Sequence, residues 1–107
     1  MSDQILADLA STIRSRRAAA SDKSYTRKLL DGGPEYCARK LGEEAIETVI
    51  AGISGSQDEL RAEAADVLYH LLVLLEVRDV SLDEVLAILD QRTGQSGLEE
   101  KAARPQS

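Results

Sequence analysis

Acidic side chains recur at helical spacing in two neighbouring segments of the chain. Glu43, Glu44 and Glu47 form an E-E-x-x-E pattern, and Glu63 and Asp66 form an E-x-x-D pattern. At ~100° per residue, the first set spans an arc of about 100° on a helix and the second about 60°. Carboxylate oxygens are the ligands that Mg²⁺ and Mn²⁺ prefer, so the two patterns together indicate chemistry assisted by a divalent cation.

The two acidic patterns can act together only if their helices are antiparallel neighbours. The stretch from Thr48 to Ala62 that separates them holds a tight turn, and Glu47 and Glu63 lie at similar distances from it. We therefore expect the carboxylates to face one another. Like charges held this close raise one another's pKa, so protons or a cation must neutralise them. A bound Mg²⁺ keeps open positions for water and phosphate oxygens, as metal-assisted phosphoanhydride hydrolysis requires.

Two other interpretations of these acidic residues stay open. A solvated helix face is the plain alternative for Glu43, Glu44 and Glu47. A ferritin-like di-iron bundle uses paired E-x-x-H motifs, but the single histidine, His70, follows Asp66 by four positions and completes no such motif. His70 alone is more typical of a hydrogen-bonded core histidine than of a ligand.

The charge pattern excludes several other classes of protein. The net charge is −6, yet residues 14–40 hold eight bases against three acids, and residues 41–90 hold two bases against twelve acids. A nucleic-acid-binding protein is not expected at this balance, and three tyrosines are too few for base-stacking recognition of single strands. One cysteine excludes an internal disulfide and a Cys-rich zinc site. No membrane span or secretory signal is expected, so the predicted location is the cytoplasm.

Four helices and no strand are expected from the apolar periodicity. They run from about Asp3 to Arg17, from Pro34 to about Ile53, from Ser56 as N-cap to about Arg78, and from Ser81 as N-cap to about Thr93. Ser-x-x-Glu capping boxes mark the starts of the last two helices. Residues 18–33 have no periodic apolar face, and Gly32-Gly33 would end any helix that began there.

The third predicted helix is apolar on nearly every side. Its sequence from Val67 to Val77 is VLYHLLVLLEV. Such a helix is usually buried all round, which one short chain cannot achieve, although a single exposed leucine flank is the alternative. The prediction is an all-α, four-helix bundle completed by homodimerisation, with one domain at 1–93 and a polar tail at 94–107.

These motifs resemble a known family. K-x-G-E-E-A-x-E at 40–47, followed by E-A-A-D-V-L-Y-H-L-L-V-L-L at 63–75, is similar to phosphoribosyl-ATP pyrophosphohydrolase of histidine biosynthesis. That family belongs to the all-α nucleotide pyrophosphohydrolase superfamily, with MazG-like and dimeric dUTPase enzymes. K-S-Y-T-x-x-L-L from Lys23, Leu41-Gly42 and S-G-L-E-E-K at 96–101 narrow the resemblance to this member. The similarity spans nearly the whole chain.

The resemblance implies hydrolysis of the α–β phosphoanhydride of phosphoribosyl-ATP, giving phosphoribosyl-AMP and pyrophosphate with Mg²⁺, or Mn²⁺, as cofactor. It implies that four carboxylates bind the metal: Glu44, Glu47, Glu63 and Asp66. Glu43 matches the first acid of the motif, as a ligand or as a base that positions water. The resemblance also implies a basic set of substrate-binding residues: Lys23, Ser24, Tyr25, Arg27, Lys28 and Lys40. An unspecific solvated loop is the alternative for residues 23–28.

Two other functions remain open on these residues. A housecleaning nucleoside triphosphate pyrophosphohydrolase would have the same carboxylate site with a different base pocket. A non-catalytic helical dimerisation module would tolerate loss of Glu63 and Asp66 and show no dependence on Mg²⁺.

Overall fold

The computed structural model describes residues 4–19 and 23–93, and within these ranges the chain is all-helical. Five helices follow one another: α1 (Ile5–Ala18), α2 (Tyr25–Asp31), α3 (Gly33–Ser54), α4 (Gln57–Val77) and α5 (Leu82–Arg92). The predicted all-α class is confirmed, and four of the five helices were expected. The predicted polar tail at 94–107 lies outside the described residues.

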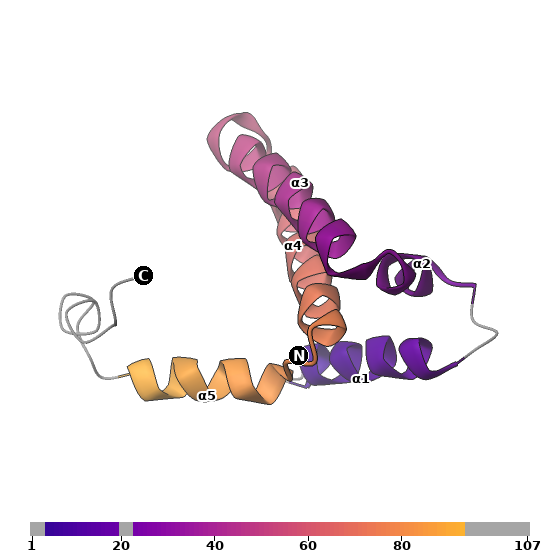
Figure 1. Ribbon diagram of the computed structural model, residues 1–107. Helices are drawn as coiled ribbons and strands as arrows, with labels where there is room; N and C mark the ends of the chain where they lie inside the picture. The colour runs from indigo at the N-terminus through magenta and orange to yellow at the C-terminus, as the bar shows by residue number, and fades with distance from the viewer. Residues whose placement is uncertain (1–3, 20–22, 94–107) are drawn as a thin grey trace.

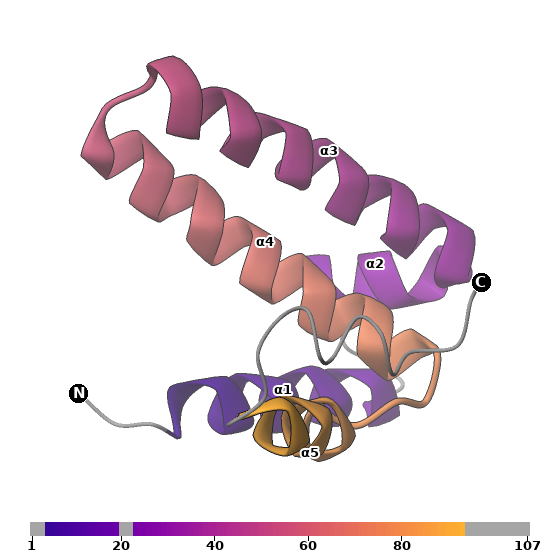
Figure 2. The ribbon, with the colours of Figure 1, turned by 90° about the vertical axis from the view of Figure 1, so that its left-hand side faces the viewer.

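Helices α3 and α4 form a long antiparallel hairpin that dominates the molecule (Figures 1 and 2). The predicted capping box starts α4: Glu59 N donates to Ser56 Oγ and Ser56 N donates to Glu59 Oε1, both at 3.1 Å. A second box starts α5, with Ser81 and Glu84 exchanging bonds of 2.9 and 3.1 Å. Each box satisfies two backbone donors at a helix start, which is why these boundaries could be read from the sequence.

No helix was predicted in residues 18–33, and this was wrong, because α2 lies within them. Its buried residues are Thr26, Leu29 and Leu30, so a threonine occupies one of the three inward positions. Ser24 caps the helix by accepting a hydrogen bond from Arg27 N at 3.2 Å. A seven-residue helix with two apolar inward residues is too short to give a clear periodic signal.

The junction between α2 and α3 depends on two glycines. Gly33 has φ of 84°, a left-handed conformation that favours glycine. A side chain at Gly32 would collide with the ring of Tyr36, which packs directly over that backbone. Pro34 stands within the first turn of α3, where its missing N–H costs no helical hydrogen bond.

The hydrophobic core lies at one end of the α3–α4 hairpin, where α1 and α2 pack against it (Figure 2). Its buried members are Ile13, Leu29, Leu30, Cys37, Leu72 and Val73. Cys37 Sγ donates to Leu29 O at 3.1 Å, and burial raises the pKa of this thiol. Arg17 joins α1 to the end of α4, with bonds of 2.7 Å to Glu76 and 2.8 Å to Asp79.

The opposite end of the hairpin leaves its apolar residues uncovered by the described chain. Ile46, Val49, Ile50 and Ile53 follow one side of α3 and are 63, 59, 58 and 82 % exposed. On α4, the predicted all-round burial holds only in part, because Leu68 is 45 % exposed. The apolar arc of α3 is therefore not a core surface of one chain.

Helix α5 runs outward from the base of the hairpin rather than along it (Figure 1). Leu86, Ile88 and Leu89 are exposed, while Leu82 packs at the edge of the core. Among the described residues, no helix combines the length and the apolar character needed to cross a membrane.

Candidate metal centre and substrate site

The structure brings carboxylates of α3 and α4 together midway along the hairpin. Glu44, Glu63 and Asp66 each offer one oxygen, and the three oxygens lie within 4.8 Å of one another. Glu44 and Glu63 are half-buried, whereas Asp66 is exposed. Antiparallel packing of α3 against α4 places the two acidic patterns at matching heights, as their distances from the turn predict.

Glu47 lies beside this group and adds to its charge. A hydrogen bond with Glu47 and the charge of that carboxylate help to raise the pKa of both Glu44 and Glu63. Desolvation is the largest cause for each residue, and together with the neighbouring carboxylates it raises the pKa of Glu44 to about 7. All four residues predicted as metal ligands thus lie in one acidic neighbourhood, which we call the carboxylate group.

One carboxylate oxygen of Glu63 lacks a hydrogen-bond partner among the described residues. This atom, Oε2, is buried. A buried carboxylate oxygen without a donor costs free energy, which a cation in contact with it would recover. This orphaned atom, the raised pKa values and the all-oxygen donor set fit a hard divalent ion such as Mg²⁺ or Mn²⁺.

Thr48 links the two helices at the carboxylate group. Its Oγ1 lies 2.8 Å from Glu44 O and 3.2 Å from Glu63 O, so one hydroxyl proton is shared between the backbones of two carboxylate residues. The first contact is an ordinary bond to the preceding turn, and the second crosses to α4. The interhelical contact fixes the register of Glu44 against Glu63.

Glu43 points to a different neighbourhood from the carboxylate group. It is exposed and pairs with Lys40 Nζ at 3.4 Å, one turn earlier on α3. Lys40 also lies over the ring of Tyr36, with Nζ 5.7 Å from the ring centroid. The predicted role of Glu43, as a ligand or as a base that positions water, stays a prediction.

The remaining predicted substrate residues lie on α2 and just before it. Lys23 and Lys28 are exposed, and Ser24 is the N-cap. Arg27 is instead engaged within the fold, with bonds of 2.9 Å to Asp31 and 2.6 Å to the carbonyl of Ala19. The structure thus leaves the two lysines in solvent and holds Arg27 between α2 and the end of α1.

Tyrosines join α2 to the carboxylate group. Tyr25 is 51 % exposed and stacks on Tyr69 of α4, with ring centroids 6.4 Å apart. Burial is the largest cause that raises the pKa of Tyr25, while Lys40 lowers it and Glu44 is among the groups that raise it. The stacking partner Tyr69 lies one turn after Asp66 on α4. Thr26 Oγ1 lies 2.6 Å from Tyr69 Oη in a hydrogen bond.

Thr26 and Tyr69 were missed in the sequence, although both stand inside the motifs. Thr26 is the threonine of S-Y-T, and Tyr69 lies between Asp66 and His70. The scarcity of aromatic residues could have drawn attention to Tyr69, because the chain has three tyrosines and no phenylalanine or tryptophan. Two of those tyrosines stack on each other beside the predicted metal site.

His70 is a buried residue of this aromatic neighbourhood. It is 5 % exposed, and its ring meets Tyr69 edge-on at 5.1 Å and Tyr25 at 6.2 Å. Desolvation lowers its pKa, with Asp66 acting in the opposite direction. The two ring contacts are those of a packed core histidine.

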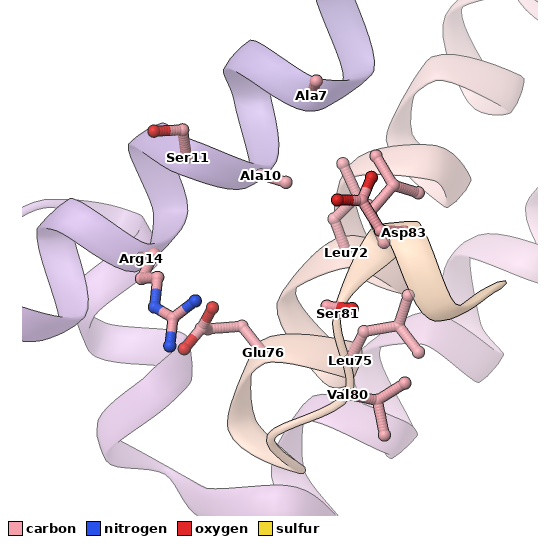
Figure 3. Close-up of a pocket in the computed structure, with 11 residues that line it drawn as sticks. Ala7, Ala10, Ser11, Arg14, Leu72, Leu75, Glu76, Val80, Ser81 and Asp83 are labelled. Carbon is pink, nitrogen blue, oxygen red and sulfur yellow. The ribbon is translucent and has the colours of Figure 1, made fainter. Parts of the chain in front are cut away.

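Two hollows lie near the ends of α4. One, of about 270 Å³, is lined by Glu47, Glu63 and the turn between α3 and α4, so the carboxylate group borders it. The other, also about 270 Å³, lies between α1, the end of α4 and the start of α5 (Figure 3). Arg14 and Glu76 point toward one another across it. It contains none of the predicted site residues.

Comparisons with known proteins place the chain in a family. The family profile described as "Phosphoribosyl-ATP pyrophosphohydrolase" matches residues 6–93. The "Phosphoribosyl-ATP pyrophosphatase" of Ruegeria pomeroyi is 59 % identical over 94 % of this chain and 96 % of its own length. "Phosphoribosyl-ATP pyrophosphatase 1" of Bradyrhizobium diazoefficiens is 60 % identical over 91 % of this chain and 92 % of its own.

A third relative shows the same coverage at lower identity. The Cereibacter sphaeroides protein of the same name is 53 % identical over 94 % of this chain and 97 % of its own. The matched region runs from the second residue of α1 to the end of α5 and therefore includes every residue of the carboxylate group and of the S-Y-T segment. On this evidence, the chain belongs to the phosphoribosyl-ATP pyrophosphohydrolase family.

Proposed function

We propose that this protein hydrolyses 1-(5-phosphoribosyl)-ATP at its α–β phosphoanhydride, giving phosphoribosyl-AMP and pyrophosphate in the second step of L-histidine biosynthesis. Membership of the family supports the substrate, because the relatives carry that activity in their names. The observation that carries the chemistry is the carboxylate group, three of whose oxygens lie within 4.8 Å.

We further propose that the carboxylate group binds Mg²⁺, with Mn²⁺ as a substitute. Glu44, Glu63 and Asp66 would hold the ion, with Glu47 beside them. When bound, the ion would lower the pKa of water and reduce the negative charge on the phosphoanhydride. The orphaned Oε2 of Glu63 supports this assignment.

Two further roles, proton acceptance and phosphate binding, fall to side chains in and around the carboxylate group. Water adds to the α- or β-phosphorus, and the bond from that phosphorus to the bridging oxygen breaks, so the bridging oxygen leaves on the other fragment. A proton must leave the attacking water. A carboxylate beside the ion, such as Glu47, can take that proton. The lysines at positions 23, 28 and 40 would hold outlying phosphates by charge-assisted hydrogen bonds.

Pyrophosphate release separates this function from the two alternatives. The assay uses phosphoribosyl-ATP and a panel of nucleoside triphosphates, each with Mg²⁺ and with EDTA. We expect Mg²⁺-dependent release from phosphoribosyl-ATP well above that from the panel. A faster reaction with another nucleotide would indicate a housecleaning enzyme, and no reaction with any substrate would indicate a non-catalytic module.

We also propose that two copies of the chain form a homodimer through α3. The support is the exposed stripe Ile46, Val49, Ile50 and Ile53, whose spacing of three and four residues makes it continuous along the helix. Contiguous exposed apolar surface of this kind marks an interaction site. Pairing of two α3–α4 hairpins across it would complete a four-helix bundle from two chains.

Sedimentation velocity tests the homodimer. We expect a particle of twice the chain mass at micromolar concentration, and a monomer for Ile50→Asp. Ile5→Asp is the matched control, because Ile5 on α1 is 60 % exposed and Ile50 is 58 % exposed. A monomeric wild type, or a dimer that Ile50→Asp leaves intact, would contradict the proposed interface.

A further inference from the structure

The two ends of α2 are held to the molecule by different contacts. Toward its C-terminal end, Leu29 and Leu30 are buried in the core and Leu29 O accepts from Cys37 Sγ. The N-terminal turn, which carries the S-Y-T motif, lacks such apolar anchoring. A helix of seven residues does not hold its own shape in water, so this turn needs contacts of its own.

Two of those contacts converge on one side chain of α4, Tyr69. Its hydroxyl is 2.6 Å from Thr26 Oγ1, and its ring stacks under Tyr25 at an interplanar angle of 22°. Thr26 is only 8 % exposed and Tyr69 is half-buried, so this hydrogen bond is partly screened from solvent. Tyr69 follows Asp66 by three residues, which places the anchor on the helix that carries Asp66 and Glu63.

We propose that the Thr26–Tyr69 hydrogen bond positions the substrate-binding segment against the carboxylate group. It fixes the N-terminal turn of α2 to α4, so that Tyr25, Lys23 and Lys28 stand at a set distance from the residues that hold the metal. Thr26 and Tyr69 are positioning residues and do not themselves contact the substrate. This inference rests on the proposed function and adds to it the contact that joins the substrate-binding segment to the carboxylate group.

Removal of either hydroxyl should loosen the segment while sparing the metal residues. We expect Tyr69→Phe and Thr26→Val each to raise KM for phosphoribosyl-ATP about three- to tenfold, the range of one net hydrogen bond. We expect kcat and the Mg²⁺-induced rise in Tm to stay within twofold of wild type. Both variants retain their packing, because the phenyl ring still stacks and valine matches threonine in shape.

A double-mutant cycle decides whether the two residues act through one bond. Because both single changes delete the same contact, the double variant should have a KM no higher than about twice that of the worse single variant. Thr26→Ser keeps the hydroxyl and should restore KM close to wild type. Thr12→Val is the matched control, since the Thr12 hydroxyl on α1 bonds only within its own helix, to Asp8 O at 3.0 Å.

Hydrogen–deuterium exchange gives a readout that does not need activity. The amides of residues 24–28 should exchange faster in both single variants, with no change around Glu44 and Glu63. Unchanged KM in folded variants of an active enzyme, or KM increases that multiply in the double variant, would overturn the proposal. If Tyr69→Phe does not fold, the pair Thr26→Val and Thr26→Ser decides alone. A wild type inactive on phosphoribosyl-ATP would instead contradict the proposed function, and unchanged exchange at 24–28 would still overturn the positioning role.

Discussion

At the scale of single residues, Glu63 is the side chain whose surroundings most need a cation. Its Oε2 is buried and has no partner in the part of the chain that the structure describes, and desolvation, followed by Glu47, raises its pKa. Repulsion among these neighbouring carboxylates lowers the free energy of unfolding while no cation is bound. Loss of this charge should therefore stabilise the metal-free fold and disable the enzyme.

We expect Glu63→Gln to raise Tm in EDTA and to abolish pyrophosphate release. The stabilisation of the wild type by Mg²⁺, about 2.7 kcal/mol at a hundredfold excess over Kd, should shrink or vanish. Thermal melts with EDTA and with Mg²⁺ measure both effects. Glu35→Gln removes an exposed charge from α3 outside the group and should change neither. A variant that melts lower in EDTA and keeps its Mg²⁺ response would show that Glu63 is structural.

Tyr25 offers an exposed aromatic face next to the carboxylate group. Base–aromatic stacking contributes about 1–3 kcal/mol, so Tyr25→Ala should raise KM for phosphoribosyl-ATP about fivefold to a hundredfold. Tyr25→Phe keeps the ring and should stay near wild type. Steady-state kinetics at saturating Mg²⁺ give the comparison, and equal KM values for the two variants would exclude a stacking role.

At the scale of helices, the register of α3 against α4 decides whether the carboxylates meet. We expect Thr48→Val to lower the free energy of unfolding by about 0.5–1.5 kcal/mol and to weaken Mg²⁺ affinity, because the contact with Glu63 O is lost. Thr48→Ser should behave as wild type. Urea unfolding and Mg²⁺ titration measure the two effects, with Thr12→Val as control. A Thr48→Val protein with unchanged Mg²⁺ affinity would contradict this role.

Helix boundaries were predictable where a local device sets them. The starts of α4 and α5 followed from Ser56 and Ser81, whose side chains cap the backbone whatever the rest of the fold does. The convergence of Glu44, Glu63 and Asp66 followed from helical spacing and one tight turn. Helix α2 did not follow, because its stability depends on burial against α1, α3 and α4, which only the folded chain provides.

The contacts that join α2 to α4 beside the carboxylate group could not be predicted from the sequence either. The Thr26–Tyr69 bond spans 43 positions, and no spacing rule relates residues so far apart. The substrate-binding role of Arg27 stays a prediction, and the sequence did not indicate that its guanidinium bonds to Asp31 and to the carbonyl of Ala19. Charge type alone does not distinguish a lysine left in solvent from an arginine that joins two helices.

At the scale of the whole molecule, the acidic neighbourhood makes metal-free stability depend on pH. The pKa of Glu44 rises from its ordinary 4.5 to about 7 on folding. A raised pKa contributes stability that is complete below about 4.5 and is lost as pH rises through about 7. His70 acts in the opposite direction, since its lowered pKa costs stability as pH falls below its ordinary 6.5.

A comparison of two proteins isolates the contribution of Glu44. We expect the Tm of the wild type in EDTA to fall relative to that of Glu44→Gln as the pH rises from 5 to 8, because the variant cannot ionise at this position. His70 is common to both proteins and cancels in the difference. Parallel Tm curves across this range would show that Glu44 does not titrate abnormally in the folded chain.

The apolar stripe on α3 is not covered by the described residues of a single chain. Periodicity placed Ile46, Val49, Ile50 and Ile53 on one side of a helix, but it could not say which molecule covers that side. The described chain buries its core at the other end of the hairpin, around Leu29 and Val73. The contacts within one described chain therefore bury the apolar residues at one end of the hairpin and leave the stripe on α3 exposed.

The central claim is that the carboxylates between α3 and α4 form a metal-dependent hydrolytic site for phosphoribosyl-ATP. A Mg²⁺ titration of pyrophosphate release, for the wild type and for Asp66→Asn, tests it most directly. We expect the wild-type rate to rise with Mg²⁺ and saturate, to be negligible in EDTA, and to be lost in Asp66→Asn at every Mg²⁺ concentration. Equal rates in EDTA and in Mg²⁺, or an Asp66→Asn protein with wild-type activity, would contradict the claim.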